Sequence, residues 1–232
     1  MPEHAESYTV LRRGAQIHHE IERKRSRFVT VLRRVETPED AQHVLSELRQ
    51  ANPTARHHCS AWVIGPERSV QRGQDDGEPS GTAGAPMLAA LLKSEMPSGA
   101  ADLSDVLAVV IRWFGGTLLG AGGLVSAYSD SILETLRTSG EQGDMVTRRS
   151  MQRFEVAAPI AEVGRWENEF RVLGAHVLGT DYSPDGSAAR LLVAVQDSTP
   201  QVAELHRHVA SLSSGAAVPV AAGQHWTDLG GP

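Results

Sequence analysis

The segment from Asp75 to Leu88, D-D-G-E-P-S-G-T-A-G-A-P-M-L, constrains the fold more than any other part of the chain. Its glycines Gly77, Gly81 and Gly84 allow a left-handed backbone or a close approach of two chain segments. Pro86 suits the first turn of a helix, because its missing N–H would be unpaired there in any residue. The segment is therefore predicted to be a tight loop that leads into a helix N-terminus, and function is expected here.

The chemistry of this loop leaves several roles open. A helix N-terminus presents unpaired N–H groups, so together with the hydroxyls of Ser80 and Thr82 it could hold an anion such as phosphate. The carboxylates of Asp75, Asp76 and Glu78 would repel a bare phosphate unless they cap backbone N–H groups, pair with arginines or bind a divalent cation. The alternative is a capped loop whose acids are simply solvated.

Bulk properties predict a two-domain cytoplasmic protein. A length of 232 residues exceeds the usual single domain, and 41% hydrophobic residues are enough for two cores. The apolar run Val106–Ile111 is far too short for a membrane span and ends at Arg112, and the N-terminus lacks the pattern of a secretory signal. The single cysteine, Cys59, excludes an internal disulfide and a cysteine-based zinc site.

Charge is distributed unevenly along the chain. The formal net charge of −6 argues against a protein that coats nucleic acid through bulk positive charge. Residues 1–34, however, hold eight lysines and arginines against four acids. This basic entry segment is either a solvated strand face or a local contact for phosphate.

Hydrophobic periodicity and turn signals divide the first part of the chain into strands and helices. Thr37 supplies an N-cap, Asn52-Pro53 ends that helix, and a polar loop is expected to run through Arg72 to the opening segment. A stretch with five glycines, residues 113–123, precedes the last helix. The expected elements are strands at 17–23 and 27–34, a helix at 38–51, a strand at 58–65, a helix at 86–95, a strand at 105–112 and a helix at 124–139.

The rest of the chain has a pattern of its own. A polar, glycine-containing stretch at 140–149 is the predicted linker. The elements after it follow the order β-α-β-β-α-β, which is typical of the ferredoxin-like fold. We therefore predict an α+β protein with a first domain at 1–145, a ferredoxin-like βαββαβ domain at 151–222 and a frayed tail at 223–232.

Three stretches, A-R-H-H-C-S-A-W at 55–62, the opening segment and V-V-I-R-W-F-G-G-T-L-L-G-A-G-G-L-V at 109–125, closely resemble the signatures of the IMPACT family, bacterial YigZ branch. The resemblance covers about residues 16–140. It implies a first domain similar to domain 2 of a small-subunit ribosomal protein and to domain IV of elongation factor G, and a second similar to domain V of that factor. One departure is that Trp113-Phe114 stands where two tyrosines are common.

The resemblance also implies a class of function. Eukaryotic relatives regulate the translational response to amino-acid starvation by binding a ribosome-associated activator of a kinase. We therefore expect a non-enzymatic, translation-associated and stress-related protein that binds the ribosome, RNA or a ribosome-bound protein, without a cofactor and without a membrane. No catalytic residue comes with the family.

The residues themselves point to binding more than to catalysis. His57 and Cys59 share one strand face while His58 points to the other, so a structural Cys59 is favoured over a nucleophile or metal site. Arg112 ends an apolar strand and is expected to pair with one of the loop acids or to fix a phosphate. The predicted binding residues are Arg56, His57, Arg72, Asp75, Asp76, Gly77, Glu78, Ser80, Gly81, Thr82, Gly84, Arg112, Gly115 and Gly116.

The competing hypothesis is an enzyme. In that case Asp75, Asp76 and Glu78 would hold a divalent metal in a hydrolase or transferase acting on a small phosphorylated or nucleotide substrate. The sequence shows neither a nucleophile–base constellation nor a phosphate-binding fingerprint, which lowers this hypothesis.

Overall fold

The computed structural model describes residues 6–184, 186 and 188–229, which form two sheets and five α-helices in two compact units. The first unit contains the described chain through Thr147 together with Leu229, and the second contains Arg148–Asp228. The predicted α+β class is confirmed. None of the described helices combines the length and the hydropathy needed to cross a membrane.

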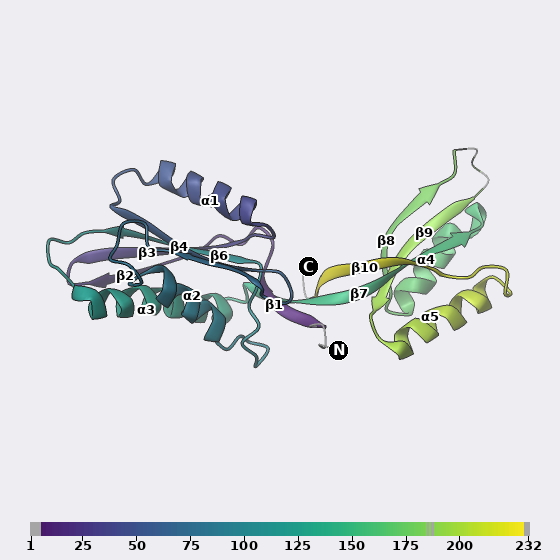
Figure 1. The fold of residues 1–232 in the computed structure, drawn as a ribbon. Coiled ribbons are helices and arrows are strands. Elements are labelled where there is room, and N and C mark those ends of the chain that lie inside the picture. The colour runs from purple at the N-terminus through teal and green to yellow at the C-terminus, as the bar shows by residue number, and fades with distance from the viewer. Residues whose placement is uncertain (1–5, 185, 187, 230–232) are drawn as a thin grey trace. The chain divides into compact units, whose positions relative to one another are not determined.

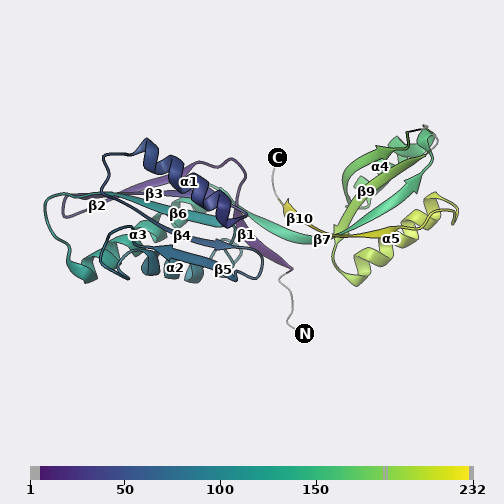
Figure 2. The same ribbon diagram turned by 45° about the horizontal axis from the view of Figure 1, so that its top comes forward.

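The first unit is built on an antiparallel sheet with the strand order β2-β3-β6-β4-β5 (Figures 1 and 2). Strands β2 (Ile17–Arg23) and β3 (Ser26–Arg34) form the predicted hairpin. Its two-residue turn places Lys24 and Arg25 at φ 47° and 66°. Two left-handed residues are what a tight hairpin turn needs to match the strand twist.

Both faces of this sheet are covered. Helix α1 (Pro38–Ala51) packs on one face, and its N-terminus carries a capping box made by Thr37 and Asp40. Helices α2 (Gly84–Lys93) and α3 (Gly120–Glu141) pack on the other face. The central strand β6 (Val106–Trp113) is therefore a continuous apolar run, and β4 (His57–Ile64) lies beside it.

Two strands of the first unit escaped sequence-based prediction. Strand β5 (Val70–Gln74) occupies the sheet edge where a polar loop was expected, and almost all of its side chains are exposed, so no apolar alternation marks it. Strand β1 (Ser7–Leu11) is a neighbour of β7 and makes a parallel bridge from Thr9 to Leu103.

The second unit has the predicted order β-α-β-β-α-β, with a short 3₁₀ turn, Ile160–Glu162, before its first helix. In its sheet β9 pairs with β7 and β8, and β10 pairs with β7. The buried apolar residues of this unit form a hydrophobic core of their own. The elements are β7 (Met145–Ala158), α4 (Val163–Val172), β8 (His176–Tyr182), β9 (Ala189–Gln196), α5 (Thr199–Leu212) and β10 (Val220–Leu229).

The two units divide between Thr147 and Arg148, inside the stretch predicted as the linker, but neither this stretch nor the tail has the irregular structure that was expected. The expected linker at 140–149 is the end of α3, a short turn and the start of β7, because Val146, Arg148 and Ser150 are buried at alternate positions. The expected frayed tail is largely β10, a strand interrupted by Gly223 and mostly half-exposed, which hides its pattern. Residues 230–232 lie outside the described part of the chain.

Candidate functional site

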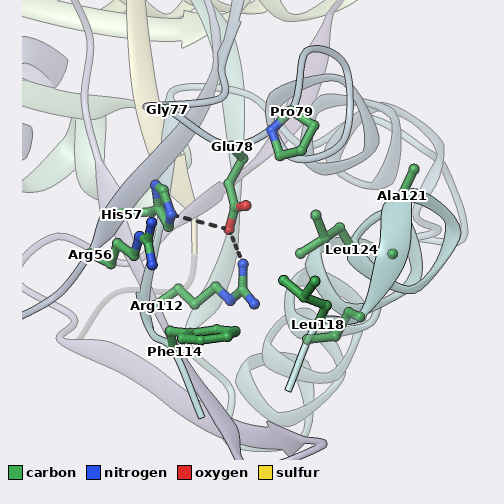
Figure 3. Close-up of a pocket in the computed structure, with 12 residues that line it drawn as sticks. Arg56, His57, Gly77, Glu78, Pro79, Arg112, Phe114, Leu118, Ala121 and Leu124 are labelled. Carbon is green, nitrogen blue, oxygen red and sulfur yellow. Dashed lines mark hydrogen bonds and ion pairs between the residues drawn. The ribbon is translucent and has the colours of Figure 1, made fainter. Parts of the chain in front are cut away.

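A cavity of about 380 Å³ opens at the end of the first sheet where β4 begins and β6 ends (Figure 3). Three chain segments meet there: the start of β4, the loop after β5 and the stretch from the end of β6 into α3. The cavity is lined by Arg56, His57, Gly77, Glu78, Pro79, Arg112, Phe114, Leu118, Leu119, Gly120, Ala121 and Leu124.

A buried ion pair forms the floor of this cavity. Arg112 Nη1 lies 2.5 Å from Glu78 Oε1, and the two side chains are only 6% and 4% exposed. Burial of one charge without the other would be costly, so the pair fixes the loop after β5 to the end of β6. The predicted internal partner of Arg112 is thus Glu78, and Asp75 and Asp76 make other contacts.

Neutral side chains hold both members of the Arg112–Glu78 pair by hydrogen bonds. The Tyr128 hydroxyl donates to Glu78 Oε1 over 2.7 Å, and burial, reinforced by Cys59 and Glu78, raises the Tyr128 pKa so that it stays a donor. Ser26 Oγ accepts from Arg112 Nη2 over 3.3 Å and from the Gly115 N–H over 3.2 Å. The geometry of the pair is therefore set before any ligand arrives.

His57 has a fixed orientation at the cavity wall. Its Nδ1 lies 2.8 Å from the backbone carbonyl oxygen of Asp76, which can only accept, so Nδ1 carries the proton. Its Nε2 lies 3.9 Å from Glu78 Oε1. His58 follows His57 in sequence but does not line the cavity. It is buried, and burial lowers its pKa.

The side chain of Asp75 takes the place of the anion that was considered for the N-terminus of α2. Its Oδ1 accepts from the N–H groups of Ala83 and Gly84 over 3.0 and 2.8 Å, and its Oδ2 accepts from Gly81 over 2.8 Å. Burial opposes ionisation, but these three hydrogen bonds prevail and lower the Asp75 pKa. The hydroxyl of Thr82 donates to the Pro79 carbonyl.

The three loop acids do not converge on a cation. Asp76, at φ 45°, pairs through Oδ1 with Arg49 Nη2 over 2.6 Å and accepts the His58 N–H through Oδ2 over 2.6 Å. Asp75 faces α2 and Glu78 faces Arg112. Within the described ranges no group of three histidine, cysteine, aspartate or glutamate side chains is arranged to hold a metal ion.

Cys59 is a core residue. It is fully buried beside Tyr128 and its thiol donates to the Asp75 carbonyl oxygen over 2.9 Å. Burial raises its pKa to about 12, so at neutral pH it holds its proton and offers no thiolate for nucleophilic catalysis.

The remaining predicted site residues hold the loops or lie elsewhere. Gly84 and Gly115 are required by close approach, because a Cβ would lie 2.4 Å from Gln74 N at Gly84 and 2.0 Å from Arg25 backbone atoms at Gly115. Arg72 stacks over Trp62, a residue of the core under α1, and does not line the cavity. The other predicted residues that do not line it are Asp75, Asp76, Ser80, Gly81, Thr82, Gly84, Gly115 and Gly116.

Sequence reasoning missed the apolar side chains of the cavity. Phe114 lies beside Arg112, and Leu118 and Leu124 lie across the cavity from them; Leu118 is 82% exposed. The five glycines of 113–123 pointed to this stretch, but they indicated a loop before the helix and not the apolar side chains beside them. The helix begins about one turn earlier than expected, at Gly120. Its first turn is made largely of glycines, whose low helix propensity led the sequence pattern to place the start too late.

Comparison with known proteins agrees with this architecture. The Impact N-terminal domain matches residues 24–136, and an IMPACT family member of Thermus thermophilus is 38% identical over 144 residues, which is 70% of that protein. The chain belongs to the IMPACT family. Two further members are YvyE of Bacillus subtilis, 43% identical over 153 residues, and YigZ of Escherichia coli, 47% identical over 116 residues.

These matches differ in extent. The aligned segments cover 66% and 49% of this chain, and 65% and 53% of YvyE and YigZ. A crystal structure of a hypothetical protein covers 94% of this chain at a TM-score of 0.63 and 33% identity, and 98% of its own length is matched. The likeness to that structure thus extends over both units.

Proposed function

We propose that this IMPACT family protein is a non-enzymatic regulator of translation that binds RNA at the ribosome through the end of its first sheet. One observation carries the proposal: exposed cations and aromatic rings occur together at the same sheet end as the cavity, and two of the cations lie over rings. The cations are Lys24, Arg25, Arg27 and Arg56, and the rings are Trp113 and Phe114.

Two arginine–aromatic contacts lie within this group. The Arg27 guanidinium lies 4.1 Å from the centre of the Trp113 ring, and the Arg56 guanidinium lies 5.8 Å from the centre of the Phe114 ring. Arg25 donates to Thr117 Oγ1 over 3.0 Å, and Arg27 also lies 3.8 Å from a carboxylate oxygen of Glu20. Arginines over aromatic rings offer both phosphate contacts and stacking, the two means by which proteins bind unpaired RNA.

The chemistry of the site supports binding over catalysis. The thiol of Cys59 is protonated and buried, and the three loop acids are held apart by separate partners. The overall charge of −6 means that attraction to RNA must come from this local surface and not from the whole protein. The proposal places the protein in the cytoplasm, with the ribosome or its RNA as partner and no cofactor.

The proposal extends to the two units. We propose that residues 1–145 and 151–222 fold as separate domains, the first like domain IV of elongation factor G and the second ferredoxin-like. The order β10-β7-β9-β8 of hydrogen-bonded strands in the second unit supports the ferredoxin-like assignment.

Ribosome co-sedimentation at graded salt tests the function. Wild type is compared with the triple variant Lys24→Ala, Arg25→Ala, Arg56→Ala, and the matched control removes three exposed arginines of the second unit, Arg165, Arg171 and Arg207. We expect the first triple variant to bind at least about tenfold more weakly and its salt slope to fall by about 2, since each lost phosphate contact removes about 0.7 from the slope for single strands.

Two outcomes contradict the proposal. Equal weakening by the control would show that binding follows net charge alone. Tight ribosome binding that is nearly independent of salt would instead indicate a ribosomal or ribosome-bound protein as the partner.

A further inference from the structure

We propose that the cavity beside this surface binds a single nucleotide. Its phosphate would lie on the N-terminus of α3, its base among the apolar side chains of Phe114, Leu118 and Leu124, and one of its N–H or O–H groups would donate to Glu78. The inference rests on the proposed function, because the cavity would take one unpaired or terminal nucleotide of the bound RNA.

The first observation is the open N-terminus of α3. The preceding residue, Leu119, makes no capping hydrogen bond, and the first turn contains no acidic residue. Gly120 and Ala121 line the cavity, and Gly120 has a φ of 76° that favours glycine. A helix of 22 residues with uncapped N–H groups at a cavity wall presents donors and a positive dipole end to an anion.

The second observation is independent of the helix. All the hydrogen bonds that the Glu78 carboxylate accepts from described side chains reach Oε1, from Arg112 and Tyr128. The other oxygen, Oε2, accepts none from the described residues, although the side chain is 4% exposed and lines the cavity. Arg112 adds a buried Nε without a partner in the described structure. Glu78 thus keeps an oxygen at the cavity that can accept from a ligand N–H or O–H, and a buried polar atom without a partner, as at Arg112 Nε, is costly.

The third observation is that apolar side chains lie on both sides of the cavity, with Phe114 beside Arg112 and the two leucines opposite. Phe114 is 39% exposed and Leu118 is 82% exposed, so a flat apolar ring has a surface to cover. In Figure 3 the side chains of Leu118 and Leu124 face Arg112 and Glu78 across the cavity. An inorganic anion would leave these apolar side chains unused. A nucleotide supplies the planar base, the phosphate and the donor at once, and about 380 Å³ is enough for one.

Calorimetric titration of the full chain with AMP, GMP, CMP and UMP tests the inference, with adenosine and inorganic phosphate as partial ligands. We expect saturable binding of at least one 5′-monophosphate, and at least about tenfold weaker binding of its nucleoside and of phosphate alone, because each fills one half of the site. Phosphate binding as tight as that of the nucleotide, or no saturable nucleotide binding, would overturn the inference.

A matched pair of variants locates the phosphate. Ala121→Glu places a carboxylate in the first turn of α3 at the cavity, and Gly122→Glu places the same charge in the same turn outside the cavity lining, where a Cβ meets nothing within 4 Å. Both suit the helix dipole, so both should fold. We expect Ala121→Glu to weaken nucleotide binding at least about tenfold and Gly122→Glu to stay within about twofold. Equal effects would overturn the assignment of the phosphate to this terminus.

Competition distinguishes the source of the nucleotide and separates this inference from the proposed function. A short unpaired RNA that displaces AMP supports an RNA-borne nucleotide, and a short RNA that binds without displacing AMP contradicts it. If wild type does not bind AMP and Ala121→Glu still co-sediments with ribosomes, nucleotide binding in the cavity is rejected and the proposed function is not. If the wild-type protein binds AMP but does not co-sediment with ribosomes, the proposed function is rejected and the cavity assignment is not.

Discussion

Two helices of the first unit, α2 and α3, begin directly after glycine-rich loops, and they differ in whether a side chain caps the N-terminus. At α2 the Asp75 carboxylate accepts N–H groups of Gly81, Ala83 and Gly84. At α3 no side chain in the described part of the chain caps the first turn, and Gly120 and Ala121 of that turn line the cavity. The loop with the denser motif is therefore closed by its own acid, and the plainer glycine stretch is the open one.

This difference shows what a glycine-rich loop does and does not indicate. Both loops have the composition of an anion site. The cap at α2 comes from a residue eight and nine positions before the N–H groups it binds, and the residue directly before the helix is Ala83, which cannot cap. Whether a helix N-terminus is available to a ligand thus depends on contacts beyond the usual capping window.

The largest expected effect concerns the pair that joins the two regions. Arg112→Ala should lower the free energy of unfolding by about 3–5 kcal/mol, because it leaves the Glu78 carboxylate buried without its partner. The double variant Arg112→Met, Glu78→Leu should recover much of that loss, since it removes both charges from the interior. Urea unfolding monitored by circular dichroism measures both.

A double-mutant cycle sharpens the same comparison. Among the described residues Asp75 and Arg112 share no side-chain partner, so Arg112→Ala and Asp75→Ala should be additive within about 0.5 kcal/mol. Coupling well above that value would show that the cap of α2 and the cavity floor act as one unit.

The next effect tests the closed terminus. Asp75→Ala should cost about 2 kcal/mol of stability, because three N–H groups lose their acceptor, and amide exchange at Ala83 and Gly84 should accelerate. Ser80→Ala, an exposed position in the same loop, is the control and should change neither. An Asp75→Ala protein as stable as wild type would mean that water replaces the cap at no cost.

The Asp75 effect should also depend on pH. Because hydrogen bonding lowers the folded-state pKa of Asp75 below the ordinary 3.8, its contribution is complete above the unfolded value and is lost as the pH falls through the folded value. The stability difference between wild type and Asp75→Ala should therefore be constant from neutral pH down to about 5 and shrink below about 4. A difference that persists undiminished into strong acid would contradict the role of the ionised carboxylate.

Local signals predicted much of this fold, and long-range contacts limited the rest. The turn at Lys24 and Arg25 and the Thr37 cap depend on neighbours in sequence, and both elements were located correctly. Strand β5 lacks an apolar face and was missed. Glu78 and Arg112 were both singled out, but their pairing spans 34 positions, and no periodicity distinguishes Glu78 from Asp75 or Asp76 as the partner. Leu118 was missed because an exposed leucine in a loop leaves no pattern.

The smallest expected effect on stability is at the open terminus, and it separates packing from binding. Leu118 is 82% exposed, so Leu118→Ser should change the unfolding free energy by less than about 0.5 kcal/mol. If the base of a nucleotide covers this side chain, the same change should weaken AMP binding about fivefold, as expected when a partly buried apolar contact is lost. Val218→Ser, an exposed loop position of the second unit at 67%, is the matched control and should alter neither quantity. If Leu118→Ser leaves the affinity for AMP unchanged, the base does not contact this side chain. The two helix termini would then differ only in the phosphate contact proposed at α3.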